Sequence, residues 1–247
     1  MVTFEELCWT SFILTMYSPD EEEIFLDEHK LFRDKLRNNP REITDDDVQK
    51  TLIKGFLNKW KCRGKNNSES AKAIKNCIDE LKPQFQRLEG KSIEYELLAD
   101  LEPIVIEIYD KIRKSLKDYR FGPTAISKLL HIINPNLFVM WDGNIRDKYA
   151  EKNSKIGDSG EGYFTFLEEM QKIAKEIRED FRRTKSKPSA TGTDVASYLD
   201  EKLSLLMKDN QSCKTSLARY IDMHNWLVIT MRGRKPILPL GWHPAMD

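Results

Sequence analysis

The chain has 247 residues, of which 40% are hydrophobic and 32% are charged, a balance typical of a helix-rich globular protein that excludes an intrinsically disordered one. No apolar run approaches the ~18 residues of a membrane-spanning helix, and the N-terminus lacks the basic and apolar regions of a secretion signal. We therefore expect a cytoplasmic protein that has no membrane partner. The net charge of zero argues against a strongly basic, non-specific nucleic-acid coating protein.

The charge is unevenly distributed along the chain. Residues 1–47 hold 13 acidic and five basic residues, so the remaining 200 residues carry a net charge of +8. What matters for nucleic-acid binding is a local basic surface, and the neutral total leaves room for one.

Cofactor and metal motifs are missing from the sequence. The four cysteines, Cys8, Cys62, Cys77 and Cys213, are too widely spaced for a disulfide framework or a thiolate metal site. There is no histidine pair at metal-binding spacing, no G-x-S-x-G motif, no Walker loop and no dinucleotide fingerprint. We expect no metal and no cofactor, and the commonest hydrolase, NTPase and dehydrogenase classes are excluded.

The N-terminal part of the chain is predicted to form three helices. Thr3 and Glu6 make a capping box before an almost wholly apolar helix over residues 4–17. Ser18-Pro19 begins a second helix that runs to about Arg37. A third helix begins at residues 44–47, and its apolar residues follow the helical period: Val48, Leu52, Ile53, Phe56, Leu57 and Trp60.

Helices also dominate the rest of the chain. We predict helices over about 70–81, which Pro83 ends, and over 91–101. A longer helix starts at Pro103, and its apolar face consists of Val105, Ile108, Tyr109, Ile112 and Leu116. A long amphipathic helix follows the glycine-rich loop 154–162. Its predicted buried stripe consists of Phe164, Leu167, Met170, Ala174, Ile177 and Phe181. Residues 184–192 are typical of a linker, and two helices follow near 193–208 and 213–224. Residues 226–231 (WLVITM) are predicted to form a strand, before a proline-rich tail.

The candidate functional residues lie mainly in the stretch from Tyr119 to Tyr149. After Gly122-Pro123, a helix from Thr124 separates an apolar face from a polar face, which predicts that Lys128 and His131 point away from the core into solvent or a cleft. The preceding residues 111–120 contain five basic residues and one acidic residue. Cations at Lys117, Arg120 and Lys128, together with the helix start, would form a place where a phosphate binds. The alternative is a polar face that only contacts solvent.

An aspartate follows the apolar run LFVMW. Asp142 precedes Gly143-Asn144-Ile145-Arg146, which is typical of a helix N-cap. Capping and catalysis are compatible, because a capping carboxylate is fixed in direction by backbone N–H groups.

The order of these features resembles the helix-hairpin-helix DNA glycosylases. In that superfamily a G-x-G-x-x-T-A hairpin holds the DNA backbone, and an aspartate beyond the second helix stabilises the sugar cation as the base leaves. Gly122, Thr124 and Ala125 match the end of the hairpin motif, and Asp142 matches the aspartate; about 30 residues carry the resemblance. The first hairpin glycine is replaced by Arg120 or Phe121.

The resemblance implies roles for individual residues. Bifunctional members carry a nucleophilic lysine just before Thr-Ala, where this chain has Pro123; Lys128, one turn later, could replace it only if the helix were shifted. Asp142 without that lysine implies a monofunctional glycosylase or a relative that has lost the reaction. DNA contacts are expected from Lys117, Arg120, Gly122, Thr124 and Arg146. The pocket for a flipped base would be lined by His131, Trp141, Asn144 and Tyr149, with Trp60 as a further aromatic candidate; core packing is the alternative for the aromatic residues.

We therefore predict an all-α protein with a helix-hairpin-helix-like centre and at most one short strand or hairpin near the C-terminus. A helical body, 1–183, contains the hairpin-like stretch 103–150, and residues 193–247 are expected to pack on it. The expected partner is duplex DNA, and the oligomeric state is left open. The competing hypothesis is a non-catalytic helical protein that binds a protein or nucleic-acid partner and in which Asp142 only caps a helix.

Overall fold

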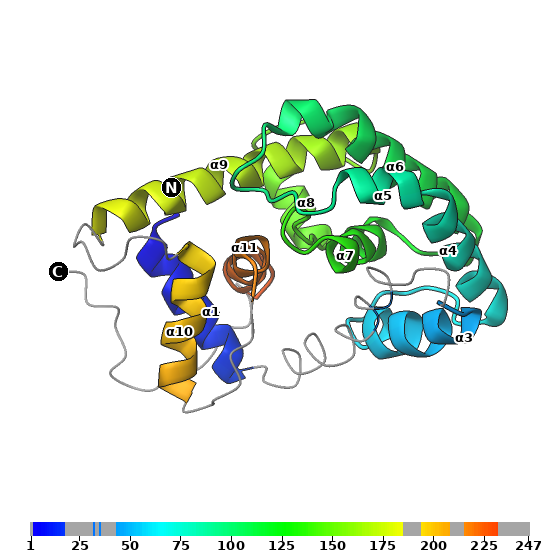
Figure 1. Cartoon of the computed structure of the whole chain (residues 1–247), viewed down its shortest axis with the longest axis horizontal. Helices are drawn as coiled ribbons and strands as arrows, with labels where there is room; N and C mark the ends of the chain where they lie inside the picture. Colours follow the sequence, from blue (N-terminus) through cyan, green and yellow to red (C-terminus); the bar gives the residue numbers. More distant parts are fainter. Residues whose placement is uncertain are drawn as a thin grey trace.

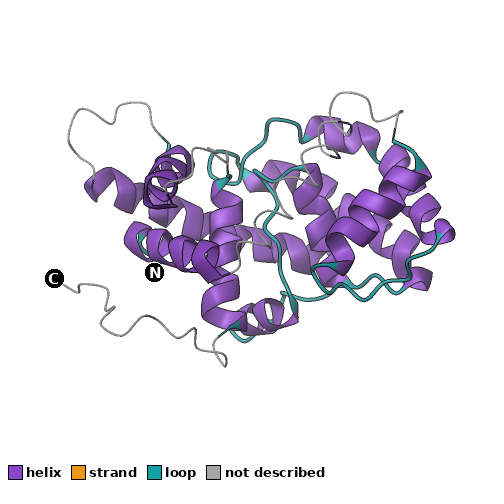
Figure 2. Ribbon diagram, turned by 90° about the horizontal axis from the view of Figure 1, so that it is seen from below, coloured by secondary structure: helices purple, strands orange, loops and turns teal. Residues whose placement is uncertain are grey.

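The computed structural model describes residues 2–17, 32, 35, 43–184, 194–207 and 215–231. All regular structure within these residues is helical, which confirms the predicted all-α class (Figure 2). The α-helices are α1 (Phe4–Tyr17), α3 (Asp45–Asp47), α4 (Ser68–Glu80), α5 (Lys82–Arg87), α6 (Glu102–Leu116), α7 (Pro123–Ile133), α8 (Gly143–Ala150), α9 (Gly160–Thr184), α10 (Val195–Met207) and α11 (Leu217–Asn225). The wider π-helices η2 (Val48–Asn58) and η6 (Trp226–Thr230) continue α3 and α11, and short 3-10 turns are η3 (Leu98–Leu101) and η4 (Lys117–Tyr119).

Helix α9 connects two groups of helices. It packs against α6 at one end of its length, and against α11 and α1 toward the other (Figure 1). Helices α4, α6, α7 and η2 make up one group, and α1, α10 and α11 make up the other. Because α9 contacts both groups, it joins the C-terminal helix α11 to the group that contains α6 and α7.

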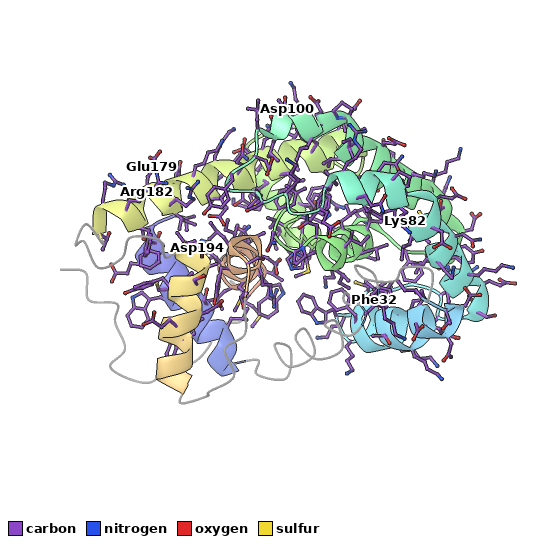
Figure 3. The ribbon with its side chains drawn as sticks, in the orientation of Figure 1. Phe32, Lys82, Asp100, Glu179, Arg182 and Asp194 are labelled. Carbon is purple, nitrogen blue, oxygen red and sulfur yellow. The ribbon has the colours of Figure 1, made fainter. Side chains whose placement is uncertain are left out.

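The apolar stripes predicted for the two longest helices among the described residues are buried. All six stripe residues of α9 lie in the core, as do Val105, Ile108, Tyr109, Ile112 and Leu116 of α6. Charged residues such as Asp100, Glu179 and Arg182 lie on the outside (Figure 3). Burial of these facing stripes against each other supplies the main stabilisation of the α6–α9 pair.

Two helix starts follow the predicted capping chemistry. Thr3 Oγ1 accepts from Glu6 N–H at 3.1 Å, and Thr3 N–H donates to Glu6 Oε2 at 2.8 Å. Thr44 caps α3 in the same reciprocal way, with Asp47 as its partner. Each box satisfies two backbone donors that have no partner inside the helix.

Three elements differ from the prediction. Residues 226–230, predicted as a strand, continue α11 as the π-helix η6. The predicted helix over 91–101 is limited to the 3-10 turn at Leu98–Leu101. Pro83, expected only to end a helix, lies in the first turn of α5, where its missing N–H costs no hydrogen bond.

Some predicted segments lie outside the residues that the structure describes. Apart from residues 32 and 35, the predicted helix from Ser18 to Arg37 lies outside the described residues, as do 185–192 of the predicted linker and the tail from Gly233. The division into 1–183 and 193–247 stays a prediction. Among the described helices, none combines the length and apolar character needed to cross a bilayer.

Candidate functional site

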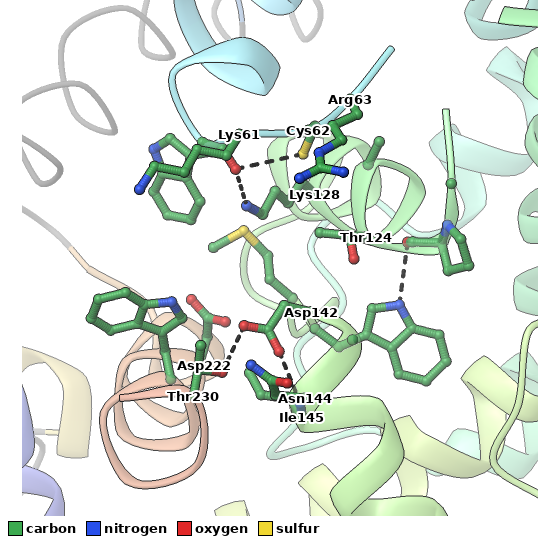
Figure 4. Close-up of a pocket in the computed structure, with 18 of the residues that line it drawn as sticks. Lys61, Cys62, Arg63, Thr124, Lys128, Asp142, Asn144, Ile145, Asp222 and Thr230 are labelled. Carbon is green, nitrogen blue, oxygen red and sulfur yellow. Dashed lines mark hydrogen bonds between the residues drawn. The ribbon is translucent and has the colours of Figure 1, made fainter. Parts of the chain in front are cut away.

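A cleft with a volume of about 910 Å³ opens between the central stretch and the C-terminal helix. Figure 4 shows Lys61, Cys62 and Arg63 on one wall, and Asp142, Asp222 and Thr230 on the opposite wall. The lining comes from four separate segments and from one residue of α1: 59–63, 120–128, 140–145, 219–231 and Leu14. Residues more than 150 positions apart therefore share one cavity.

The polar face of α7 holds the extended segment that leads to Asp142. Ser127 Oγ lies 3.2 Å from both the N and the O of Trp141. His131 Nδ1 donates to the carbonyl of Phe138 at 2.6 Å, and Tyr163 donates to the carbonyl of Val139 at 2.9 Å. Residues 137–141 form no helix or strand, so these side chains satisfy backbone groups that would otherwise be buried without partners.

His131 therefore does not point into solvent or a cleft, and that prediction is wrong. Its side chain is fully buried beneath the 137–141 segment. The polar face predicted for α7 exists, but its C-terminal part contacts backbone instead of a ligand.

Trp141 fixes the end of this segment. Its side chain is 1% exposed and packs against Tyr109, Tyr163 and Phe166. The indole Nε1 donates to the carbonyl of Pro123 at 3.2 Å. Trp141 is therefore mainly a core residue that also borders the cleft. Its hydrogen bond to Pro123 ties the start of α7 to the residue before Asp142.

Asp142 lies half-buried on the cleft wall, and both of its oxygens accept hydrogen bonds. Oδ1 accepts from the N–H of Ile145 at 2.8 Å, which is the predicted N-cap of α8. Oδ2 accepts from the hydroxyl of Thr230 at 2.6 Å. The carboxylate is held from two directions and still borders the cavity.

Lys128 reaches the cleft from α7. Its Nζ donates to the carbonyl of Trp60 at 3.2 Å and lies 4.5 Å from the centroid of the Trp60 ring. Burial lowers the pKa of the Lys128 ammonium, while Cys62, Asp222 and Asp142 oppose that shift. The thiol of Cys62, on the same wall, has its pKa raised by burial.

A second carboxyl group lies in the cleft, on α11. Asp222 is 5% exposed and accepts a hydrogen bond from Nη1 of Arg219. Burial raises its pKa to about 6; Arg219 and Lys128 oppose the shift, and Asp142 adds to it. Arg219 also lies over the Trp60 ring, with Cζ 4.9 Å from its centroid.

The lining is predominantly cationic. Two of its side chains are acidic, Asp142 and Asp222, and six are basic: Lys59, Lys61, Arg63, Arg120, Lys128 and Arg219. The first four of these cations are exposed, whereas Lys128 and Arg219 are buried. Such an arrangement attracts an anionic ligand at the rim and places carboxylates deeper in the cavity.

The structure brings together seven of the eleven residues predicted for the site: Arg120, Gly122, Thr124, Lys128, Trp141, Asp142 and Asn144. The other four lie elsewhere. Lys117 is exposed outside the cleft lining, and Arg146 pairs with its neighbour Asp147 instead of bordering the cavity. Tyr149 donates to Asn225 at 3.0 Å and packs on Phe166, so it belongs to the α8–α11 contact. His131 is buried between α7 and residues 137–141.

Sequence reasoning missed the contribution of the C-terminal helix. Thr230 belongs to residues 226–231, which were predicted to form a strand. No local pattern in WLVITM predicts a contact between Thr230 and Asp142. Arg219 and Asp222 have the i, i+3 spacing of a helical ion pair, which was available as a signal. No local pattern brings Lys61 or Arg63 to the same cavity.

No protein-family model, curated protein or solved structure matches the chain. In the part of the chain that the structure describes, no group of three His, Cys, Asp or Glu side chains converges on a place for a metal ion.

Proposed function

We propose that the chain binds DNA and hydrolyses the N-glycosidic bond of a nucleotide that enters the cleft. The observation that carries this proposal is Asp142, a half-buried carboxylate directed by Ile145 and Thr230 in a cavity with a cationic rim. The resemblance of residues 119–149 to helix-hairpin-helix DNA glycosylases supports the same reaction class.

The chemistry needs a fixed negative charge. When the bond between sugar and base breaks, the bonding electrons leave with the base and positive charge develops on the sugar, to which water then adds. A carboxylate already oriented at that position lowers the barrier electrostatically. A nucleotide must also leave the stacked duplex to reach it, and a cavity of about 910 Å³ offers room for a base.

Lys128 is the second catalytic candidate. Its Nζ lies 4.5 Å from the centroid of the Trp60 ring, a contact that favours the charged ammonium. The hydrogen bond from Nζ to the carbonyl of Trp60 directs the group toward the 59–63 wall. We assign the first step to water, and an electrostatic role to Lys128.

The test is a set of duplexes, each with one damaged base, assayed for base release and for binding. Asp142→Asn is expected to keep DNA binding and to lose base release by about 100-fold or more, because asparagine can still cap α8 but carries no charge. Asp147→Asn, on the same helix and outside the cleft, is the matched control and should release base at the wild-type rate. Borohydride in the same reactions leaves no covalent adduct if water is the nucleophile.

The competing function is nucleic-acid binding without catalysis. It is favoured by one observation: both oxygens of Asp142 already have structural partners, so capping and docking of η6 account for the residue. Wild-type protein that binds duplexes but releases no base, or equal release by wild type and Asp142→Asn, would establish this alternative.

A further inference from the structure

Helix η2 ends in a turn whose left-handed residue is a lysine. Lys61 has φ of 57°. Its N–H donates to the carbonyl of Asn58 at 2.9 Å, and the N–H of Cys62 donates to the carbonyl of Leu57 at 2.8 Å, the hydrogen-bond pattern of a Schellman motif. Glycine is favoured at this position because a β-carbon is strained at positive φ. The chain keeps a long cationic side chain there instead.

The turn before α7 repeats the same feature. Arg120 ends the α6–η4 helix with φ of 61°, and its N–H donates to the carbonyl of Lys117 at 3.2 Å. Gly122, the glycine of this turn, has φ of −88°, which any residue adopts. The strained position of the hairpin-like turn is therefore occupied by arginine and not by glycine.

These two helix ends meet at one edge of the cleft. The N–H of Lys65 donates to the carbonyl of Tyr119 at 2.8 Å, which joins the two loops. A Cβ at Gly64 would lie 2.2 Å from Cε1 of Phe121, so the loops are in close contact. Lys61, Arg63 and Arg120 are all exposed and line the cavity.

The helix dipole does not account for cations at the left-handed positions. Lys59 and Lys117 already provide positive charge at the same two helix ends, with right-handed backbone conformations that carry no strain. Among the described residues, Lys61, Arg63 and Arg120 form no ion pair that would explain them as structural. Non-glycine residues held at positive φ cluster at active sites and ligand-binding sites.

We infer that Lys61, Arg63 and Arg120 form a phosphate-binding rim, which holds the sugar–phosphate backbone of the DNA strand whose nucleotide enters the cleft. This inference rests on the DNA ligand of the proposed function, and it adds the loop 59–64, which lies outside the stretch that resembles DNA glycosylases. Three exposed cations on two adjoining loops provide more positive charge than one phosphate neutralises, which favours a strand with several phosphates over a free nucleotide.

The glycine variants Lys61→Gly and Arg120→Gly separate binding from folding. Removing the β-carbon relieves the left-handed strain, so the unfolding midpoint should stay unchanged or rise, while the Kd for a fluorescein-labelled abasic-analogue duplex rises about five- to tenfold for each variant. The slope of log Kd against log salt should fall by about one for each phosphate that a variant no longer neutralises. Arg63→Gln should weaken binding similarly, and Lys72→Gln, an exposed cation on α4 outside the cleft, should not.

Three outcomes would contradict the proposed phosphate-binding rim. The first is a wild-type Kd in all three variants, and the second is a loss of binding that is accompanied by a loss of stability. The third is competition by polyglutamate or a free nucleotide that displaces the labelled duplex as well as unlabelled duplex does. Because the readout is binding, it is independent of base release: variants that bind as wild type while Asp142→Asn loses catalysis would reject the rim and keep the proposed function. Weakened binding without any base release would keep the rim and reject catalysis.

Discussion

At the residue scale, Asp142 combines a structural and a candidate chemical role. Its Oδ1 caps α8, a contribution of about 1 kcal/mol, and its Oδ2 accepts from Thr230. The same two bonds orient the carboxylate toward the cavity. Position 142 could be identified from the sequence because N-caps have a local pattern. The partner of Oδ2 could not, since it lies 88 residues away.

Asp222 gives the fold a pH dependence with a defined sign. Burial raises its pKa to about 6, whereas the carboxyl of an unfolded chain titrates near 3.8. Between these values the folded state holds a proton that the unfolded state has lost, so the contribution of Asp222 to stability decreases as pH rises from about 4 to about 6.

We therefore expect the unfolding free energy of the wild type, relative to Asp222→Asn, to fall by roughly 2–3 kcal/mol across that pH window and to change little above it. Urea unfolding at closely spaced pH values measures this difference. Asparagine keeps an oxygen for Arg219 and cannot titrate. Asp118→Asn, which alters an exposed carboxyl, is the control; a flat difference for Asp222→Asn would show that the group is charged throughout.

At the element scale, tertiary packing overrode a local strand signal. Residues 226–231 are rich in β-branched and aromatic side chains, which favour a strand. A strand needs a pairing partner, and none exists in the described part of the chain. Instead η6 extends α11 and packs against α8 and α1, and the N–H of Met231 donates to the carbonyl of Trp226 at 3.0 Å. This continuation brings Thr230 to Asp142.

The start of α9 depends on close backbone approach. Gly162 lies against the loop before the helix, where an added Cβ would be 2.3 Å from the carbonyl oxygen of Gly157 and 2.5 Å from its nitrogen. Because backbone atoms cannot rotate away as a side chain does, the first turn of α9 would have to move.

Gly162→Ala is expected to destabilise the protein by about 3 kcal/mol, toward the upper end of overpacking costs. Thermal or urea unfolding measures the change. Gly143→Ala is the matched control, because a Cβ there meets nothing within 4 Å and the variant should lose far less stability. A loss in Gly162→Ala no larger than that in Gly143→Ala would contradict the steric explanation, because helix propensity and backbone entropy both favour alanine over glycine.

At the scale of the whole molecule, the cleft exists because α9 holds α11 and η6 against the central stretch. The hydrogen bond from Thr230 to Asp142 joins η6 to the start of α8, so the geometry of the site depends on it. The hydroxyl of Thr230 is the donor of this bond. Valine has nearly the same shape as threonine but no hydroxyl, so it is a suitable replacement for testing the bond.

Thr230→Val should reduce the unfolding free energy by about 1–2 kcal/mol, because one carboxylate oxygen loses its donor. Under the proposed function it should also slow base release. The proposed phosphate-binding rim is untouched by this change, so DNA binding under the proposed function should be unchanged. Thr165→Val, which removes a hydroxyl bonded to the carbonyl of Glu161 on the exposed side of α9, is the control. Wild-type stability and base release in Thr230→Val would show that α8 and η6 are held by packing alone.

The sequence by itself determined the helical class, the buried stripes of α6 and α9, and the capping role of Asp142, because helical periodicity and capping are local properties of the chain. The tertiary structure alone decided that α7 turns His131 inward, that residues 226–230 are helical, and that Lys61, Arg63, Arg219, Asp222 and Thr230 join the cleft. The reason is physical: which face of a helix is covered, and which charges meet, depends on packing between segments that are distant in the chain.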